Sequence, residues 1–197
     1  MVSRWGFEAL AVNQYRENAY EAVFADLDDV IRHSAWRRDF WLEEVCNSVR
    51  DTDWIDREWR RAGDDLLFWG ITPPPNGKEN RALWDTALRK AYQSAFKEKD
   101  ARKGTLINQG ELGELRDRYR NDEIAEWVLQ EERSVRILDL DVGLMPTASP
   151  IHHHTRNVNG FYAPYFSPSK NLAGIKMSTL YYNVFVLWSM TALAWAF

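Results

Sequence analysis

The chain has 197 residues, with 25 Lys and Arg, 29 Asp and Glu, 10 Trp and 1 Cys. This length predicts one domain, or one domain with an appendage, and an apolar content of 45% is enough to bury a core. The formal net charge of -4 argues against a general nucleic-acid binder, and the lone Cys46 excludes a disulfide framework or a cysteine-based zinc site within the chain.

Helical periodicity dominates the first part of the chain. Apolar residues recur at three- and four-residue steps over residues 5–31, again over 36–49, and less regularly over 54–69. The segment 72–77 reads Thr-Pro-Pro-Pro-Asn-Gly and interrupts this pattern, because successive prolines cannot continue a helix and Asn-Gly favours a turn. Three helices followed by a break are therefore predicted.

The clearest predicted helix covers residues 79–99, where the apolar side chains form a single stripe. Gly104 is expected to end it. Residues 111–132 repeat the same pattern, whereas residues 135–140 fit either a strand or a helix. Residues 146–176 are predicted to be a linker, since they contain Pro146, Pro150, Pro164 and Pro168.

Charge divides the chain into two parts. Every Lys, Arg, Asp and Glu lies within residues 1–176, and residues 177–197 carry none. As a helix, this uncharged segment would be about 31 Å long, close to the hydrocarbon thickness of a bilayer. Asn183 is one of its few strongly polar residues, and a membrane helix can direct such a side chain toward a partner helix. We therefore predict a transmembrane helix at residues 177–197, with a buried helix of a soluble domain as the alternative.

These patterns predict a mainly α fold class. It consists of a small helical bundle domain, a proline-containing linker and a C-terminal transmembrane helix. The expected divisions are a membrane-proximal helix at 1–15, a helical domain at 16–145, the linker at 146–176 and the membrane helix at 177–197. Because the chain stops within its apolar run, we expect it to be a fragment of a longer protein.

Candidate catalytic and metal-binding groups are weak in this sequence. His152, His153 and His154 are adjacent, but no acidic or cysteine partner is spaced for coordination, so a solvated loop is expected. Asp139-Leu140-Asp141 lacks the remaining ligand spacing of a calcium loop. No phosphate-binding loop, dinucleotide fingerprint or nucleophile elbow occurs. No catalytic, cofactor-binding or metal-binding residue is predicted, and we expect the chain not to be an enzyme.

For the carboxylates and tryptophans, positions on the surface or in the core are preferred to catalytic or ligand-binding roles. Asp26, Asp28 and Asp29, like Glu43 and Glu44, are expected on solvated helix surfaces. Most of the tryptophans lie on apolar stripes, so core packing is preferred to a role as sugar-stacking platforms.

One segment resembles a known family. Residues 3–15 read Ser-Arg-Trp-Gly-Phe-Glu-Ala-Leu-Ala-Val-Asn-Gln-Tyr, which is similar to a stretch in the permease part of bacterial ABC transporters of the G-subfamily type. Residues 161–164 and 183–188 also look like the return to the membrane in members with long loops. The resemblance is weak over the middle of the chain. The polar region is also longer than the usual external loop of this family, and it lacks the cysteine pair common in eukaryotic members.

The resemblance implies a role in transport. Residues 1–15 would form a re-entrant helix after the fifth membrane helix, residues 16–176 an extracytoplasmic loop domain, and residues 177–197 the sixth and last membrane helix. The re-entrant motif residues, which would help close the exit side of the translocation path, are Arg4, Trp5, Gly6, Phe7, Glu8 and Leu10. Glu8 is expected either within the membrane or as a helix-end charge at the water boundary.

The implied partners are membrane lipid, other membrane helices and a nucleotide-binding domain that carries ATP and Mg²⁺, in a dimer of half-transporters in the bacterial inner membrane. No cofactor is expected in this chain and no nucleic acid as a partner. Lys170 and Lys176 precede the apolar segment, and the positive-inside rule would instead place the polar region in the cytoplasm. A tail-anchored helical interaction protein and a soluble helical domain of unknown role are the alternatives.

Overall fold

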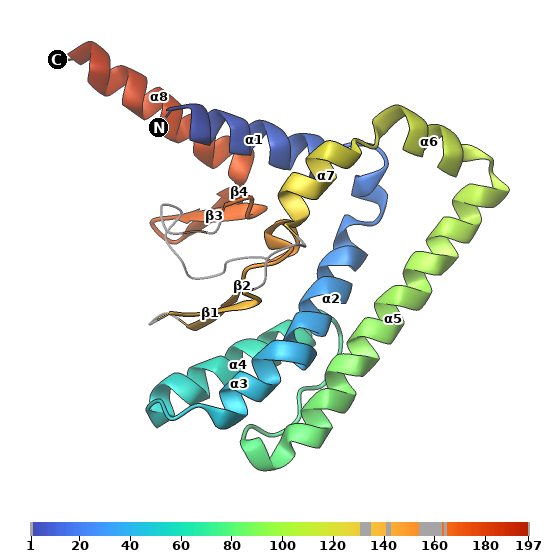
Figure 1. Ribbon diagram of the computed structural model, residues 1–197, viewed down its shortest axis with the longest axis vertical. Coiled ribbons are helices and arrows are strands. Elements are labelled where there is room, and N and C mark those ends of the chain that lie inside the picture. The colour runs from blue at the N-terminus through green and yellow to red at the C-terminus, as the bar shows by residue number, and fades with distance from the viewer. Residues whose placement is uncertain (1, 131–134, 141–142, 154–162, 164, 197) are drawn as a thin grey trace. The chain divides into compact units, whose positions relative to one another are not determined.

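The computed structural model describes residues 2–130, 135–140, 143–153, 163 and 165–196. Over these residues the structure is mainly helical, with two small antiparallel hairpins and a C-terminal helix (Figure 1). The mainly α prediction is therefore confirmed. Among the described residues, no helix is both long enough and apolar enough to cross a membrane.

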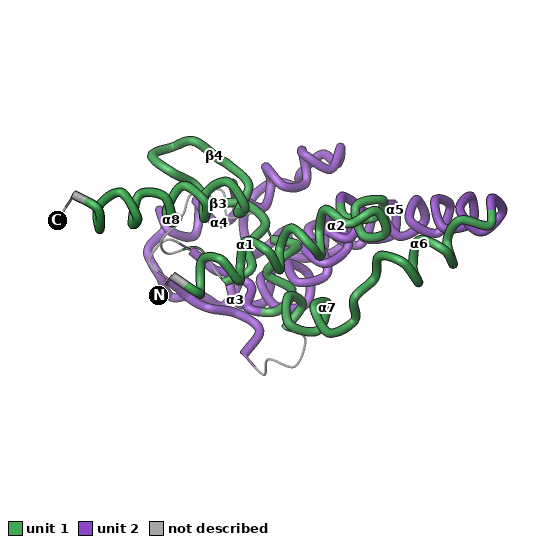
Figure 2. Tube along the Cα trace, turned by 90° about the horizontal axis from the view of Figure 1, so that it is seen from above, with its two compact units in different colours: residues 1–25, 110–133, 148–197 green, residues 26–109, 134–147 purple. Residues whose placement is uncertain are grey.

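The chain divides into two compact units (Figure 2). Unit 1 consists of residues 1–25, 110–133 and 148–197, and unit 2 of residues 26–109 and 134–147. The elements of unit 1 are α1 (Val2–Arg16), η1 (Glu21–Val23), α6 (Glu111–Tyr119), α7 (Asp122–Leu129), η4 (Pro150–His152), β3 (Ser169–Leu172), β4 (Ile175–Ser178) and α8 (Thr179–Ala196). Those of unit 2 are α2 (Ala25–Trp36), η2 (Arg37–Trp41), α3 (Leu42–Asn47), α4 (Thr52–Phe68), η3 (Lys78–Asn80), α5 (Arg81–Asn108), β1 (Ile137–Leu140) and β2 (Gly143–Pro146).

The single helix predicted over residues 5–31 is wrong, because α1 ends at Arg16 and α2 begins only at Ala25. The side chain of Asn18 causes this break. Its Nδ2 donates to the carbonyl of Gln14 at 2.9 Å, and its Oδ1 accepts from the N–H groups of Tyr20 and Glu21 at 2.9 and 2.8 Å. An asparagine that bonds the backbone in this way competes with helix continuation.

Two other helix boundaries differ from the prediction. Gly104 lies inside α5, and the helix ends instead before Gly110, which has a φ of +75° that favours glycine. The helix predicted over residues 111–132 is two helices, α6 and α7. Asn121 separates them, because its side chain accepts from the Ile124 N–H at 3.1 Å and caps α7.

The predicted linker at 146–176 contains regular structure. Its last part forms the β3–β4 hairpin, in which Leu172 pairs with Ile175. The two turn residues, Ala173 and Gly174, both have positive φ, as a two-residue type I′ turn requires. Residues 135–140, which the periodicity left open between helix and strand, contain the strand β1.

Tryptophans form the core of unit 2, as the apolar stripes predicted. Trp41, Trp59 and Trp84 are fully buried, with ring centroids 5.0–6.1 Å apart. Trp36 and Trp54 belong to the same core. The proline segment is tied to it, because the Trp84 indole donates to the carbonyl of Pro75 at 3.0 Å. Rings of this size bury much apolar surface.

Candidate functional site

Helix α1 has two buried faces within unit 1. One face, with Val12 and Tyr15, packs in an apolar cluster with Val128 of α7. The other face meets α8, and the two helices lie side by side in both views (Figures 1 and 2). Trp5 of α1 and Tyr182 of α8 contact each other there, with ring centroids 6.2 Å apart.

A polar network lies at this α1–α8 junction. Glu8, Lys170 and Asn183, here called the junction network, are 0%, 2% and 0% exposed. Glu8 Oε2 accepts from Lys170 Nζ at 2.6 Å and from Asn183 Nδ2 at 3.0 Å. Lys170 Nζ also donates to Asn183 Oδ1 at 3.2 Å. The network therefore joins α1, β3 and α8 through charge-assisted hydrogen bonds.

Further bonds fix the network from outside. Asn183 Nδ2 donates to the carbonyl of Trp5 at 3.0 Å, and Glu8 Oε1 accepts from the Phe166 N–H at 3.0 Å. The Lys170 ammonium lies 4.6 Å from the Trp5 ring centroid and 5.6 Å from that of Tyr182. A buried charge is tolerated only when it is paired in this manner.

Burial dominates the electrostatics of this junction. Desolvation lowers the pKa of Lys170, against the opposing attraction of the Glu8 carboxylate. Desolvation raises the pKa of Tyr165, and the nearby Glu8 charge adds to that shift. Lys170 is therefore held in a place where its charged form is costly, which distinguishes it from the exposed Lys176 on β4.

The six motif residues predicted from the sequence lie on α1, but the structure brings only part of the set together. Trp5 and Glu8 face the junction. Arg4 is exposed, with its guanidinium 5.4 Å from the Tyr165 ring centroid, and no atom outside the helix approaches within 4 Å of a Cβ placed on Gly6. Phe7 and Leu10 are exposed on the other side, where Phe7 meets Trp127 at 5.4 Å.

Sequence reasoning missed the partners of Glu8. Lys170 was interpreted as a flanking charge in a linker, and Asn183 as a polar residue of the apolar helix. Neither position carries a local pattern that pairs it with a residue more than 150 positions earlier. The useful signal was the isolated Asn183, because an amide within an apolar helix needs a hydrogen-bonding partner.

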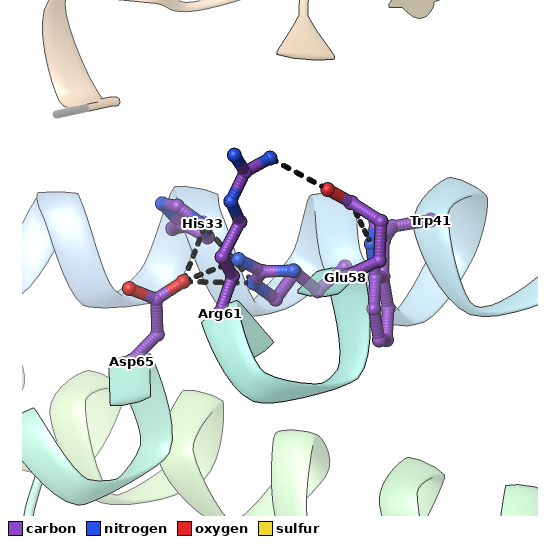
Figure 3. A network of polar contacts seen from close by, with 6 residues as sticks. His33, Trp41, Glu58, Arg61 and Asp65 are labelled. Atoms are coloured by element: carbon purple, nitrogen blue, oxygen red, sulfur yellow. Dashed lines mark hydrogen bonds and ion pairs between the residues drawn. The ribbon is translucent and has the colours of Figure 1, made fainter. Parts of the chain in front are cut away.

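Unit 2 contains a second buried polar cluster, drawn in Figure 3. It lies between the continuous α2–η2 helix and α4. Asp65 Oδ2 accepts from Arg37 Nε at 3.0 Å and lies 3.2 Å from His33 Nε2. Burial alone would raise the pKa of Asp65, but the charges and hydrogen bonds of Arg37 and His33 together outweigh it and lower that pKa strongly. The cluster thereby fixes α2 on α4.

A second pair of contacts extends this cluster (Figure 3). Glu58 Oε2 accepts from the Trp41 indole at 2.9 Å, and Glu58 Oε1 accepts from Arg61 at 2.8 Å. Trp41 and Arg37 both come from η2, a π-helical turn that points them toward α4. The β1–β2 hairpin covers the Glu58–Arg61 pair, because a Cβ on Gly143 would overlap Arg61 Nη1. These contacts stabilise packing, and all carboxylates named here have fixed donors.

The remaining sequence candidates lie apart from both networks. His152 and His153 are buried rather than solvated, which corrects the expected loop, and His154 lies outside the described residues. Asp139 pairs with Arg50 at 2.9 Å, and Asp141 is not described. Asp26 and Asp28 pair with Arg102 and Lys99. Among the described residues, no group of His, Cys, Asp and Glu is arranged to hold a metal ion.

Comparisons with known proteins add no relative. The chain matches no protein-family model, and no curated protein or solved structure is significantly similar to it.

Proposed function

We propose that this chain is part of the transmembrane subunit of an ATP-driven ABC transporter. In this role α1 is the re-entrant helix, α8 is the last membrane helix, and the polar region between them is an extracytoplasmic loop domain. The observation that carries the proposal is the surface of α8. Apart from the face covered by α1 and the β3–β4 hairpin, this uncharged helix exposes large apolar side chains, namely Tyr181, Phe185, Trp188, Leu193 and Trp195.

An exposed apolar surface of this kind favours a lipid or protein environment. Trp188 is 75% exposed and Trp195 is 92% exposed, and exposed aromatic side chains clustered on one helix mark an interaction surface. This surface and the resemblance of residues 3–15 to ABC permeases together support the proposal.

The junction network supports the α1–α8 pairing that the proposal requires. Asn183 of α8 donates to the Trp5 carbonyl and to Glu8 Oε2 of α1, and these hydrogen bonds hold the two helices together where an apolar contact alone would give little preference in lipid. Glu8 is the acidic residue of the motif, and its burial against Lys170 gives a physical reason for an acid within an apolar helix pair.

The two lysines before α8 do not decide the orientation of the polar region. The positive-inside rule counts Lys and Arg in short loops, and long domains translocate largely regardless of their charge. Residues 16–176 are such a long region, so Lys170 and Lys176 do not oppose the extracytoplasmic placement that the resemblance implies. ATP and Mg²⁺ would be bound by a separate nucleotide-binding domain.

Membrane fractionation of the full chain tests the proposal. Bacterial membranes that contain the chain are washed with alkaline carbonate, and the pellet and supernatant are compared. We expect the wild-type chain in the pellet and a Phe185→Glu/Trp188→Glu variant in the supernatant, because each charge in the membrane is costly. A Glu43→Gln/Glu44→Gln variant is the control, since these residues are exposed on α3.

A second measurement separates the transporter from a tail-anchored interaction protein. The chain is purified in mild detergent from its native host, and bound proteins are identified. A co-purifying ATPase with a phosphate-binding loop supports the transporter. A wild-type chain in the carbonate supernatant, or a membrane-bound chain without such a partner, rejects the proposal.

A further inference from the structure

We infer that α1 and α8 form a binding site for a primary ammonium group, which the chain's own Lys170 occupies in this structure. The inference deepens the proposed function and rests on it for one point, the role of the ligand: a cationic amine that the transporter carries.

The groups that recognise the ammonium all come from two helices. Trp5 and Glu8 belong to α1, and Tyr182 and Asn183 belong to α8. Together they offer a carboxylate oxygen at 2.6 Å, an amide oxygen at 3.2 Å and two aromatic faces at 4.6 and 5.6 Å. Carboxylates, carbonyl oxygens and aromatic faces are the groups that bind ammonium ions. The β3–β4 hairpin contributes only the occupant, Lys170.

The site is organised by bonds that do not involve its occupant. Asn183 Nδ2 donates to both Glu8 Oε2 and the Trp5 carbonyl, which leaves its Oδ1 directed at the ammonium. Glu8 Oε1 is held by the Phe166 N–H. The orientation of the carboxylate and the amide therefore does not depend on the lysine, and another ammonium would meet the same acceptors.

Lys170, which occupies the site, belongs to the small β3–β4 hairpin. The hairpin has two strands of four residues, and its outer strand β4 includes the exposed Ile175 and Lys176. Two-stranded hairpins are marginally stable by themselves, so the seating of this one depends on contacts such as that of Lys170. Burial of the ammonium is costly, as the lowered pKa of Lys170 reflects. An amine that takes its place would release the hairpin.

The acceptors define the class of ligand. Two hydrogen bonds, to Glu8 and Asn183, require N–H donors, so a primary ammonium fits and a quaternary ammonium does not. The aromatic faces favour an alkyl chain next to the charge. Because Lys170 acts as a tethered competitor, its effective concentration is of the order of millimolar or higher, and a free amine must exceed it.

The test uses the full chain in non-ionic detergent, with n-butylammonium chloride as the probe. In the Lys170→Ala variant the internal competitor is absent, and we expect a saturable rise in Tm with butylammonium. The neutral 1-butanol and tetramethylammonium should leave Tm unchanged. Adding Glu8→Gln to Lys170→Ala should raise the butylammonium concentration that gives half of the Tm rise at least about tenfold, because a charge-assisted hydrogen bond is lost. The matched control is Lys176→Ala, which keeps Lys170 in the site. Its change in Tm with butylammonium should equal that of the wild-type chain.

Hydrogen exchange of the wild-type chain provides the second arm, which needs no folded variant. We expect butylammonium, titrated upward from about 1 mM, to accelerate amide exchange in residues 169–178 as its concentration rises, relative to the same concentrations of sodium chloride. Equal Tm responses to butylammonium and butanol, or hairpin exchange that butylammonium leaves unchanged, would overturn the inference. Neither measurement involves a membrane or an ATPase. A negative result would therefore overturn the ammonium site alone, and the proposed function would still be decided by carbonate extraction and co-purification.

Discussion

Glu8 and Lys170 form an ion pair of 2.6 Å between α1 and β3, and both side chains are almost completely removed from solvent. The pair is separated by 162 positions in the chain. The same carboxylate also accepts a hydrogen bond from Asn183 of α8, so Glu8 joins α1 to both β3 and α8. Removal of either partner should therefore affect the whole junction.

We predict unequal effects of single and double substitutions at this pair. Glu8→Gln and Lys170→Met should each lower the free energy of unfolding by about 3–5 kcal/mol, because each leaves a buried charge without its partner. A Glu8→Leu/Lys170→Met chain should be close to wild type or more stable. Chemical denaturation in detergent measures all three. Lys97→Met, exposed on α5, is the control and should change stability by less than about 0.5 kcal/mol. Additive losses in the double variant would contradict a buried, desolvated pair.

Asp65 should contribute to stability in a pH-dependent way. Its pKa is strongly lowered in the folded chain by Arg37 and His33, so the unfolded state binds the proton first as pH falls. The contribution is complete above the ordinary aspartate pKa of about 4 and is lost as pH falls below it. Asp65→Asn should thus remove part of the acid sensitivity of unfolding between pH about 4 and 2. The exposed neighbour variant Asp64→Asn should keep it, and identical acid profiles for both variants would refute the assignment.

A side chain at Gly143 should destabilise the chain. Its φ is +134°, and a Cβ would overlap the carboxylate oxygen Oε1 of Glu58. We expect Gly143→Ala to destabilise the chain by more than about 1 kcal/mol and to speed hydrogen exchange in the β1–β2 hairpin. Gly104→Ala is the matched control. Gly104 lies in α5 with nothing within 4 Å of the added Cβ, so the change should stabilise the helix by about 0.5–1 kcal/mol. A Gly143→Ala chain as stable as Gly104→Ala would disprove the close approach.

Asn121 should act as the cap that starts α7. Its side chain accepts from the Ile124 N–H, and Asn121→Ala should cost about 0.5–2 kcal/mol. Asn121→Asp keeps the acceptor and should retain most of the stability. Thermal unfolding followed by circular dichroism compares the two, and equal losses for Ala and Asp would argue against a capping role.

Hydrophobic periodicity predicted the helical class and the tryptophan core, because both follow from the spacing of apolar residues on a single element. It did not predict where helices break. Asn18 and Asn121 act through side-chain bonds to the backbone, and these do not change the periodic pattern on either side. The β3–β4 hairpin was missed because its turn, Ala173-Gly174, is less recognisable than Asn-Gly.

Only part of the candidate site could be predicted from the sequence. The resemblance identified α1 and Glu8, since motif residues are adjacent in the chain. Lys170 and Asn183 come to Glu8 through tertiary packing, and no local rule predicts a contact over that separation. Burial of His152 had the same origin, because its ring contacts Tyr15, which belongs with Ile151 to the cluster around α1 and α7.

The most direct test of the central claim is the side of the membrane on which the polar region lies. Asn76 is exposed in the proline segment, so an Asn76→Cys chain in a Cys46→Ser background carries a single accessible thiol. A membrane-impermeant maleimide is applied to bacteria whose outer membrane alone has been made permeable, with the Cys46→Ser chain as the unlabelled control. The transporter account predicts that the Asn76→Cys chain is labelled before the inner membrane is disrupted. Labelling only after disruption would contradict it.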